Sequence, residues 1–431
     1  MDAMGSSLGR AHRPGRTDIR RPCQTRPVNA SLHAGRELVA IPGPSVVPDR
    51  VLSAMHRAMP NIYDGELIDV SNAIFEQLPA VARTTGRVFV TISNGHGAWE
   101  MAITNTLSRG DLVLVLESGP FAVAWGDMAA FVGVHVEELA APERRPVDPA
   151  AVEARLRADR AREIKAILVA HVDTGSSVRN DLTAIRRAMD AADHPALLMA
   201  DGIASLGCER YEMDAWGVDV TIGASQKGLM VPPGLGFVWA GPKALAAHAA
   251  AGLRTRYWDW TARSQDGPHY FRYCGTPPIT HLFGLREALA MIQDEGLEAV
   301  WARHAVLGSC VRAAVEAWST PGGLELNVAD PAARSNAVTT IRGGELDTDR
   351  LRAVCQEQAG LTLGVGLGTQ EGLAFRIGHM GHLNPPMILG TLGTIEAALG
   401  SMGVELRSSG VAAAAAVVAA ALARDQDLSL V

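Results

Sequence analysis

Lysine is scarce in this chain: the 431 residues include only Lys165, Lys227 and Lys243, and arginine carries most of the other basic charge. Arginine can replace lysine as a surface charge, but it does not lose its proton to form a Schiff base. Lys227 lies in Ser225-Gln226-Lys227-Gly228, between a strand-like run at 218–224 and a Gly/Pro-rich run at 228–234. This placement makes Lys227 a candidate reactive amine, although an ordinary loop lysine fits the tetrapeptide equally well.

Paired cysteines, long apolar runs and excess positive charge are also missing. The five cysteines form no C-x-x-C pair, so neither a disulfide framework nor a thiolate zinc site is indicated, and a reducing cytoplasm is the expected setting. The longest apolar run, 411–423, is too short to cross a bilayer. A net charge of -7 gives no electrostatic reason to expect nucleic acid as a partner.

Composition divides the chain into four parts. The first 36 residues hold seven arginines and two acidic residues, which is compatible with a transit peptide but lacks the apolar core of a secretory signal. We expect a flexible arginine-rich leader at 1–39, whether an arm or an overlong start. A large domain is expected at 40–285, a smaller one at 286–405 and an alanine-rich tail helix at 406–431.

Apolar runs alternate with amphipathic segments between residues 80 and 240. They predict an α/β fold with a mainly parallel sheet covered by helices on both faces, in which ligands bind beyond the carboxyl ends of the strands. The predicted strands are Val88–Ile92, Leu112–Leu116, Val134–Glu138, Ile164–Ala170, Ala196–Ala200, Val218–Ile222 and Gly236–Ala240. After Gly284, helices at 285–292, 297–318, 347–358 and 387–402 with strands at 337–341 and 373–377 predict an α+β domain.

A glycine-rich turn, Asn94-Gly95-His96-Gly97, follows the first predicted strand and opens a helix. Glycines let the backbone approach a ligand, and the free N–H groups of a first helical turn suit an anion such as phosphate. The turn matches no nucleotide fingerprint, so a plain strand-to-helix connection explains it as well. His96 could simply cap the helix.

Three charged residues lie where charge is costly. Asp201 ends the apolar run 196–200, where it could cap a turn or hold a protonated heterocyclic nitrogen. Asp173 lies in a hydroxyl-rich stretch after another strand, which could be a turn network or the wall of a cofactor site. Arg376 lies inside an apolar strand, where its guanidinium needs an anionic partner. That partner could be a structural salt bridge or a substrate carboxylate held by a bidentate fork.

The order of these features resembles the fold-type I pyridoxal phosphate enzymes, in particular the class V aminotransferases of the alanine–glyoxylate and serine–glyoxylate kind. The resemblance covers roughly residues 40 to 405. It rests most on Asn94–Glu100, Ala200-Asp201-Gly202, Ser225–Gly228, Tyr273-Cys274-Gly275-Thr276-Pro277-Pro278 and Phe375–Gly381.

The resemblance implies a role for each matching residue. Lys227 would form the Schiff base with pyridoxal 5′-phosphate and shuttle the proton, and Asp201 would pair with the pyridinium nitrogen. Phe121 would stack on the ring, Thr174 would lie near the ring oxygen, and Arg376 would bind the substrate α-carboxylate. The phosphate would be held by Asn94, Gly95, His96 and Gln226, with Tyr273 and Thr276 reaching it from the neighbouring subunit of a homodimer.

These implications favour transamination between alanine or serine and glyoxylate or pyruvate, in a protein with no nucleic-acid or membrane partner. Some segments, such as Ile62-Tyr63-Asp64 and 295–304, instead resemble pyridoxamine–pyruvate aminotransferase. That enzyme should lack a strong phosphate cup and carries an arginine where this chain has Leu367. The His-Arg pair that many glyoxylate aminotransferases carry near the substrate is missing at 61–64.

Two further readings remain open. Cysteine desulfurase chemistry needs a mobile nucleophilic cysteine, whereas Cys310 and Cys355 lie in predicted helices. A cofactor-free binding protein on the same fold would leave Lys227 unmodified.

Overall fold

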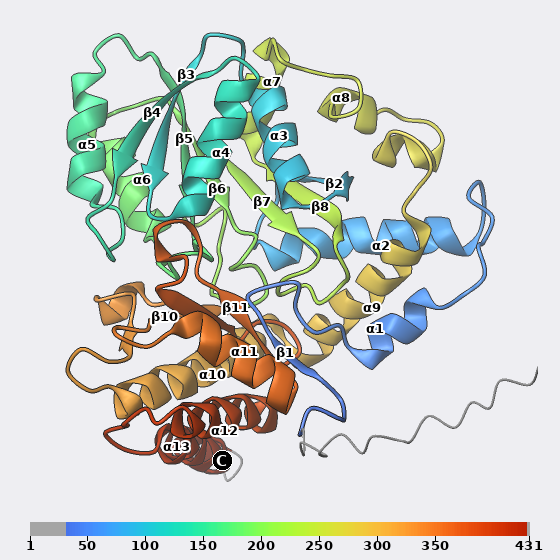
Figure 1. Ribbon diagram of the computed structural model, residues 1–431. Helices are drawn as coiled ribbons and strands as arrows, with labels where there is room; N and C mark the ends of the chain where they lie inside the picture. Colours follow the sequence, from blue (N-terminus) through green and yellow to red (C-terminus); the bar gives the residue numbers. More distant parts are fainter. Residues whose placement is uncertain (1–31, 429–431) are drawn as a thin grey trace, which may run out of the picture.

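The computed structural model describes residues 32–428 and contains two β-sheets in separate halves of the molecule (Figure 1). The larger sheet has seven strands in the order β2-β8-β7-β6-β5-β3-β4, and the smaller has five in the order β1-β11-β12-β10-β9. The predicted α/β architecture, with a large sheet and a smaller α+β unit, is confirmed.

The large sheet is mainly parallel. Its strands are β2 (Arg87–Ser93), β3 (Leu112–Glu117), β4 (His135–Ala140), β5 (Ile164–Ala170), β6 (Leu197–Asp201), β7 (Val220–Ala224) and β8 (Gly234–Ala240). Within this sheet only β8 runs antiparallel to its neighbours, β2 and β7. Each predicted strand of this region is present, with ends that differ by up to two residues.

Helices cover both faces of the large sheet. On one face lie α2 (Glu66–Val81), α5 (Pro149–Ala158), α6 (Leu182–Ala191) and α9 (Ile279–Glu295), and on the other α3 (Gly95–Thr106), α4 (Pro120–Phe131) and α7 (Pro242–Ala250). The helix α6 buries Leu182, Ile185 and Met189, which a spacing of three to four residues places on one side. Every residue of β6 is buried, as a strand with helices on both faces requires.

The small domain combines five short strands with four longer helices. The elements are β1 (Leu38–Ala40), β9 (Glu325–Leu326), β10 (Val338–Arg342), β11 (Leu361–Val365), β12 (Ala374–Gly378), α10 (Leu297–Trp318), α11 (Thr348–Ala359), α12 (Pro385–Ser401) and α13 (Gly410–Leu428). Leu307, Phe375 and Leu392 belong to its separate apolar core. The sequence did not predict β1, β9 or β11.

The expected domain limits differ from the observed packing at three places. Residues 1–31 of the expected leader lie outside the described residues, but Leu38 pairs in parallel with Leu361, so the leader's last residues belong to the small sheet. The expected boundary at 285 falls inside α9, whose Leu289 packs in the large-domain core. The tail helix α13 buries Ala414 against α10 and therefore shares the small-domain core.

Two short helices, α1 (Asp49–Met55) and α8 (Trp260–Arg263), complete the main elements. Across residues 32–428, none of the helices combines the length and apolar character needed to cross a bilayer.

Candidate active site

Eight of the predicted site residues line one cavity of about 210 Å³ beyond the carboxyl ends of β6 and β7. Asp201 is the last residue of β6, and Lys227 follows shortly after β7. This is the edge at which open parallel sheets bind ligands. The eight residues are Asn94, Gly95, His96, Phe121, Thr174, Asp201, Gln226 and Lys227.

The Lys227 amine is buried and lies beneath the loop that follows β1. Its Nζ donates a hydrogen bond to the Pro42 carbonyl oxygen. A Cβ on Gly43 would lie 2.6 Å from Nζ, so a side chain at this position would displace the amine, and the positive φ of +96° also favours glycine here. Burial lowers the pKa of Lys227 to about 8, and the nearby charge of Arg376 adds to this effect. A neutral, nucleophilic amine is therefore accessible near neutral pH.

The Asp201 carboxylate is 5% exposed and has two donors from the protein. Its Oδ1 accepts from the Ile203 backbone N–H at 2.7 Å, and its Oδ2 accepts from the Trp99 indole N–H at 3.2 Å. Burial raises the pKa of Asp201 to about 7, and the Asp173 charge contributes. Trp99 also lines the cavity, but the sequence analysis did not single it out, because nothing in the sequence shows where an indole N–H points.

The glycine-rich turn forms the start of α3. The Asn94 side chain caps the helix by accepting from the backbone N–H groups of His96 at 3.1 Å and Gly97 at 3.4 Å. A Cβ on Gly95 would lie 2.3 Å from Ile203 Cδ1, so the close approach of these loops requires glycine. Burial lowers the pKa of His96, and its ring lies 4.5 Å from the Trp99 ring. Asn94 thus performs the capping that His96 could have performed.

The Asp173 carboxylate holds the loops that carry Phe121 and Thr174. It is fully buried, its Oδ2 accepts from the Phe121 N–H at 2.8 Å, and its Oδ1 accepts from the Gly175 N–H at 2.8 Å. Burial raises the pKa of Asp173, against the effect of these donors. The sequence left two interpretations of this stretch, a turn network and the wall of a cofactor site. Asp173 takes part in a turn network, while its neighbour Thr174 lines the cavity.

Arg376 lies on β12 beside the cavity and binds carbonyl groups. Its Nε donates to the Val365 oxygen at 2.6 Å and its Nη1 to the Thr174 oxygen at 2.7 Å. Within residues 32–428 no carboxylate forms an ion pair with it, so the salt-bridge alternative is not realised there. Burial lowers the pKa of Arg376 to about 10, and the charge of Asp173 acts in the opposite direction. A buried cation without an ion-pair partner is suited to bind an anionic ligand.

Tyr273 and Thr276 lie away from this cavity within the single chain. Tyr273 is completely buried, and its hydroxyl oxygen lies 2.5 Å from Ser71 Oγ. Thr276 is exposed. Their expected role across a subunit interface remains a prediction.

The cavity lining meets the chemical requirements of pyridoxal 5′-phosphate. An aldehyde needs an amine, a pyridine nitrogen needs a carboxylate, and a phosphate needs hydrogen-bond donors. Lys227, Asp201 and the start of α3 supply these groups around one space. In the described part of the chain, the buried Gln226 Oε1 has no hydrogen-bond partner, which leaves a polar group free for a ligand. The residues present fit the cofactor.

Cys310 and Cys355, the two cysteines weighed for desulfurase chemistry, do not line this cavity. Cys310 and Cys355 are completely buried in the small-domain core, where burial raises the pKa of both thiols. A high pKa and a buried position disfavour a mobile nucleophilic thiolate. The cysteine desulfurase reading therefore finds no support in these two residues.

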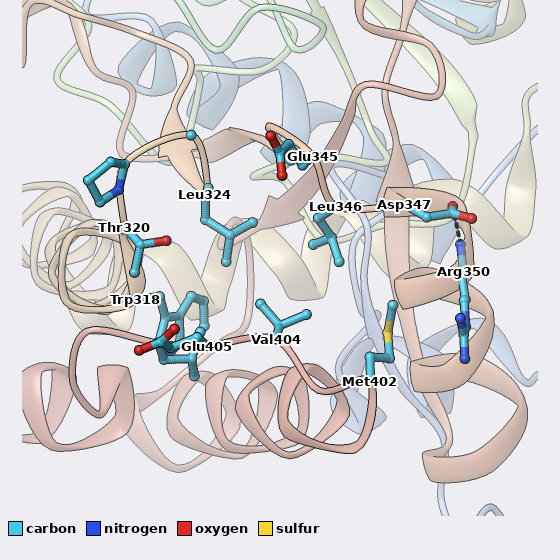
Figure 2. Close-up of a pocket in the computed structure, with 15 residues that line it drawn as sticks. Trp318, Thr320, Leu324, Glu345, Leu346, Asp347, Arg350, Met402, Val404 and Glu405 are labelled. Carbon is cyan, nitrogen blue, oxygen red and sulfur yellow. Dashed lines mark hydrogen bonds between the residues drawn. The ribbon is translucent and has the colours of Figure 1, made fainter.

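A second and larger hollow, of about 340 Å³, lies in the small domain. Figure 2 shows the residues that line it. Trp318, Leu324 and Leu346 give it apolar walls, and Glu345 and Glu405 add negative charge. It contains none of the residues that the sequence singled out. The chemistry of the lining, and not the size of the space, identifies the candidate active site.

Comparisons with known proteins agree with this geometry. The sequence model of the aminotransferase class-V family matches residues 80–382. A serine–glyoxylate aminotransferase of Methylorubrum extorquens is 40% identical over 392 residues, covering 89% of this chain and 96% of the relative. An L-aspartate–glyoxylate aminotransferase of Paracoccus denitrificans is 39% identical over 389 residues, covering 87% of this chain and 94% of the relative.

A similar solved structure is that of pyridoxamine–pyruvate aminotransferase from Mesorhizobium loti. It superimposes with a TM-score of 0.82 at 27% sequence identity, and the match covers 90% of this chain and 98% of the other. The arrangement of the two sheets is therefore shared over nearly the whole described chain.

Proposed function

The chain belongs to the class V aminotransferases, pyridoxal 5′-phosphate enzymes of fold type I, and we propose that it transfers an amino group from alanine or serine to glyoxylate or pyruvate. The observation that carries the proposal is the meeting of a buried amine, Lys227, and a buried carboxylate, Asp201, in one cavity beside Arg376. The names of the serine–glyoxylate and L-aspartate–glyoxylate relatives support glyoxylate as acceptor.

The cofactor, when bound, supplies an aldehyde that accepts the amino group and a ring that delocalises the electron pair left at the substrate α-carbon. Lys227 provides the amine for that aldehyde, and its Nζ then takes and returns the α-proton as general base. Its lowered pKa, about 8, suits this role near neutral pH. Asp201 would accept a hydrogen bond from the protonated ring nitrogen and so keep that proton in place.

The remaining residues bind and orient. Phe121 and Thr174, which line the cavity on loops that Asp173 fixes through backbone hydrogen bonds, would hold the ring. Asn94, Gly95, His96 and Gln226 lie on the phosphate side. Arg376 binds the substrate α-carboxylate with the part of its guanidinium that the Val365 and Thr174 carbonyls leave free.

A small, uncharged donor fits the charges around the cavity. Apart from Lys227, His96 is the only basic side chain among the lining residues, and burial lowers its pKa. The lining thus offers no second fixed cation for a side-chain carboxylate, which favours alanine or serine over aspartate.

We also propose a homodimer in which Tyr273 and Thr276 complete the phosphate site of the neighbouring subunit. Thr276 is exposed and available for such a contact. Tyr273 would have to break its buried hydrogen bond with Ser71 before it could reach the neighbouring subunit, whereas Thr276 needs no such rearrangement.

A second candidate function is pyridoxamine–pyruvate transamination, favoured by the structural likeness to that enzyme. Against it stand the glycine-rich turn at Asn94–Gly97, which opens α3 at the cavity as a phosphate site would, and Leu367 in place of an arginine.

Visible absorption spectra of the purified protein test both functions. A yellow protein whose band is bleached by L-alanine or L-serine, but not by L-aspartate, and restored by glyoxylate or pyruvate would support the proposal and identify the donor. A protein that stays colourless after incubation with pyridoxal 5′-phosphate would exclude it and leave the binding-protein reading. Turnover only with unphosphorylated pyridoxamine and pyruvate would establish the second candidate.

A further inference from the structure

We infer that Trp99 is a positioning residue: its indole N–H orients the Asp201 carboxylate toward the cavity and stabilises its ionised form. The inference rests on the proposed function, because it assumes that Asp201 faces the cofactor's ring nitrogen. Its basis is the hydrogen bond from Trp99 Nε1 to Asp201 Oδ2, 3.2 Å long and buried.

Trp99 joins three parts of the site through one rigid ring. It lies on α3, in the helix whose first turn carries the proposed phosphate cup. Its ring centroid lies 4.5 Å from that of His96 and 6.5 Å from that of Phe121, and its N–H reaches Asp201 on β6. The ring is completely buried, so it cannot turn away without repacking its neighbours.

The electrostatic setting explains why a neutral donor is useful here. Burial and the nearby Asp173 both disfavour the charged form of Asp201. A cationic donor would neutralise the carboxylate and compete with a protonated ring nitrogen. An indole N–H stabilises the charge without cancelling it, so the carboxylate can still attract a cation.

The same stack contains a matched control residue. Trp125, on α4, is also completely buried, and its ring lies 5.9 Å from that of Trp99 at an interplanar angle of 15°. Among residues 32–428, its indole N–H has no hydrogen-bond partner. Trp99→Phe and Trp125→Phe therefore remove the same atoms from the same stack, but only the first removes a hydrogen bond to Asp201.

The test measures the dissociation constant of pyridoxal 5′-phosphate for the apo-protein. Since hydrogen bonds to charged groups contribute more than neutral ones, Trp99→Phe is expected to raise the constant about 10-fold and Trp125→Phe less than about 2-fold. In an Asp201→Asn background, Trp99→Phe should add less than about 2-fold, because its partner charge is gone. Equal effects of the two tryptophan variants, or a full effect in the Asp201→Asn background, would overturn the inference.

A second measurement does not depend on the folding of Trp99→Phe. The chain has eight tryptophans, whose indole N–H groups can be labelled with ¹⁵N and followed by NMR in the apo-protein. One resonance should shift as the pH passes about 7, where Asp201 titrates, and should lose this response in Asp201→Asn. No such resonance in the wild-type protein would overturn the inference.

Failure of the inference and failure of the proposed function are distinguishable. If the wild-type apo-protein binds no pyridoxal 5′-phosphate, the proposed function fails. If it binds the cofactor and the two tryptophan variants behave alike, only the role of Trp99 fails.

Discussion

Asp201 and Glu209 are both buried carboxylates on the chain that leaves β6, and burial raises the pKa of both, yet their surroundings differ. Glu209 accepts hydrogen bonds from Ser335 Oγ at 2.9 Å and from the backbone and side-chain N–H groups of Asn336, all in the small domain. Asp201 has one backbone donor and the Trp99 N–H, both from its own domain. The Glu209 carboxylate therefore links the two domains, while the Asp201 carboxylate can still accept a hydrogen bond from a ligand in the cavity.

The arginines show the same difference. Arg144 donates to the carbonyl oxygens of Asn327 and Leu326 and pairs with Glu325, so its bonding is used at the domain junction. Arg376 binds two carbonyls and no carboxylate within residues 32–428. Polar groups that saturate one another hold the domains together, and those left partly unsatisfied mark the site.

The largest effect is expected on the cavity side, from Lys227→Ala. Loss of the amine should reduce transamination by at least about 1000-fold, because it removes both the nucleophile and the general base. The half-reaction with L-alanine or L-serine, followed by absorption, measures this. Lys165→Ala is the matched control: this exposed lysine on β5 donates to the Arg162 oxygen and should leave the rate unchanged. Similar losses in both variants would contradict the assignment.

Arg376→Gln should mainly affect substrate binding. Losing a charge-assisted contact to the α-carboxylate should raise KM about 100-fold, with a smaller change in kcat. Because the Arg376 charge helps lower the pKa of Lys227, that pKa should also rise, which moves the rising, acidic limb of the pH–activity profile to higher pH. Steady-state kinetics across pH measure both effects. Arg342→Gln, on the neighbouring strand β10, should change neither, and an unchanged KM in Arg376→Gln would refute the role.

Glu209→Gln tests the domain junction. An amide keeps the shape but places an N–H group among donors, so the free energy of unfolding should fall by about 2 kcal/mol. Urea denaturation measures the loss. Glu212→Gln disrupts only the surface pair with Arg210 and should change stability by less than about 0.5 kcal/mol. A large loss of kcat in Glu209→Gln with an unchanged free energy of unfolding would contradict the role of Glu209 at the domain junction.

Asp201→Asn should change the pH dependence of apo-protein stability. The pKa of Asp201 in the folded protein, about 7, lies above the usual value of 3.8 for an aspartate, so ionisation destabilises the fold increasingly between these pH values and fully above them. Asparagine removes this cost. The variant should therefore gain about 2 kcal/mol on the wild-type apo-protein between about pH 5 and about pH 8. Urea midpoints at both pH values measure the gain, and a constant difference would contradict the raised pKa.

The sequence was sufficient where the relevant information is local. Lys227 and Asp201 follow apolar runs, and the carboxyl ends of parallel strands necessarily lie at one edge. The donors around Asp201 were not predictable, because the direction of the Trp99 N–H depends on how α3 packs against β6. The hydrogen-bond partners of Arg376 were likewise not predictable, because the sequence could not show that its N–H groups donate to carbonyl oxygens and not to a carboxylate.

Long-range pairing explains the other omissions. β11 contains Gly364 and lies in a glycine-rich stretch, and its partner β1 has only three residues. Neither segment has a strong local strand signal: β11 is a strand because it lies between β1 and β12, and β1 is a strand because β11 lies beside it. Domain limits drawn from composition could not foresee that residues 38–40 join a sheet whose other strands begin after residue 324.

The pairing of β1 with β11 has a consequence for synthesis of the protein. β1 leaves the ribosome early, and the strand that receives it is made only after the whole large domain. The loop after β1 supplies the Pro42 carbonyl that binds the Lys227 amine. A nascent chain that ends before Leu361 lacks the partner that anchors this loop. Assembly of the lysine's surroundings is therefore a late event in synthesis, and closing so long a loop is one of the slower steps in folding.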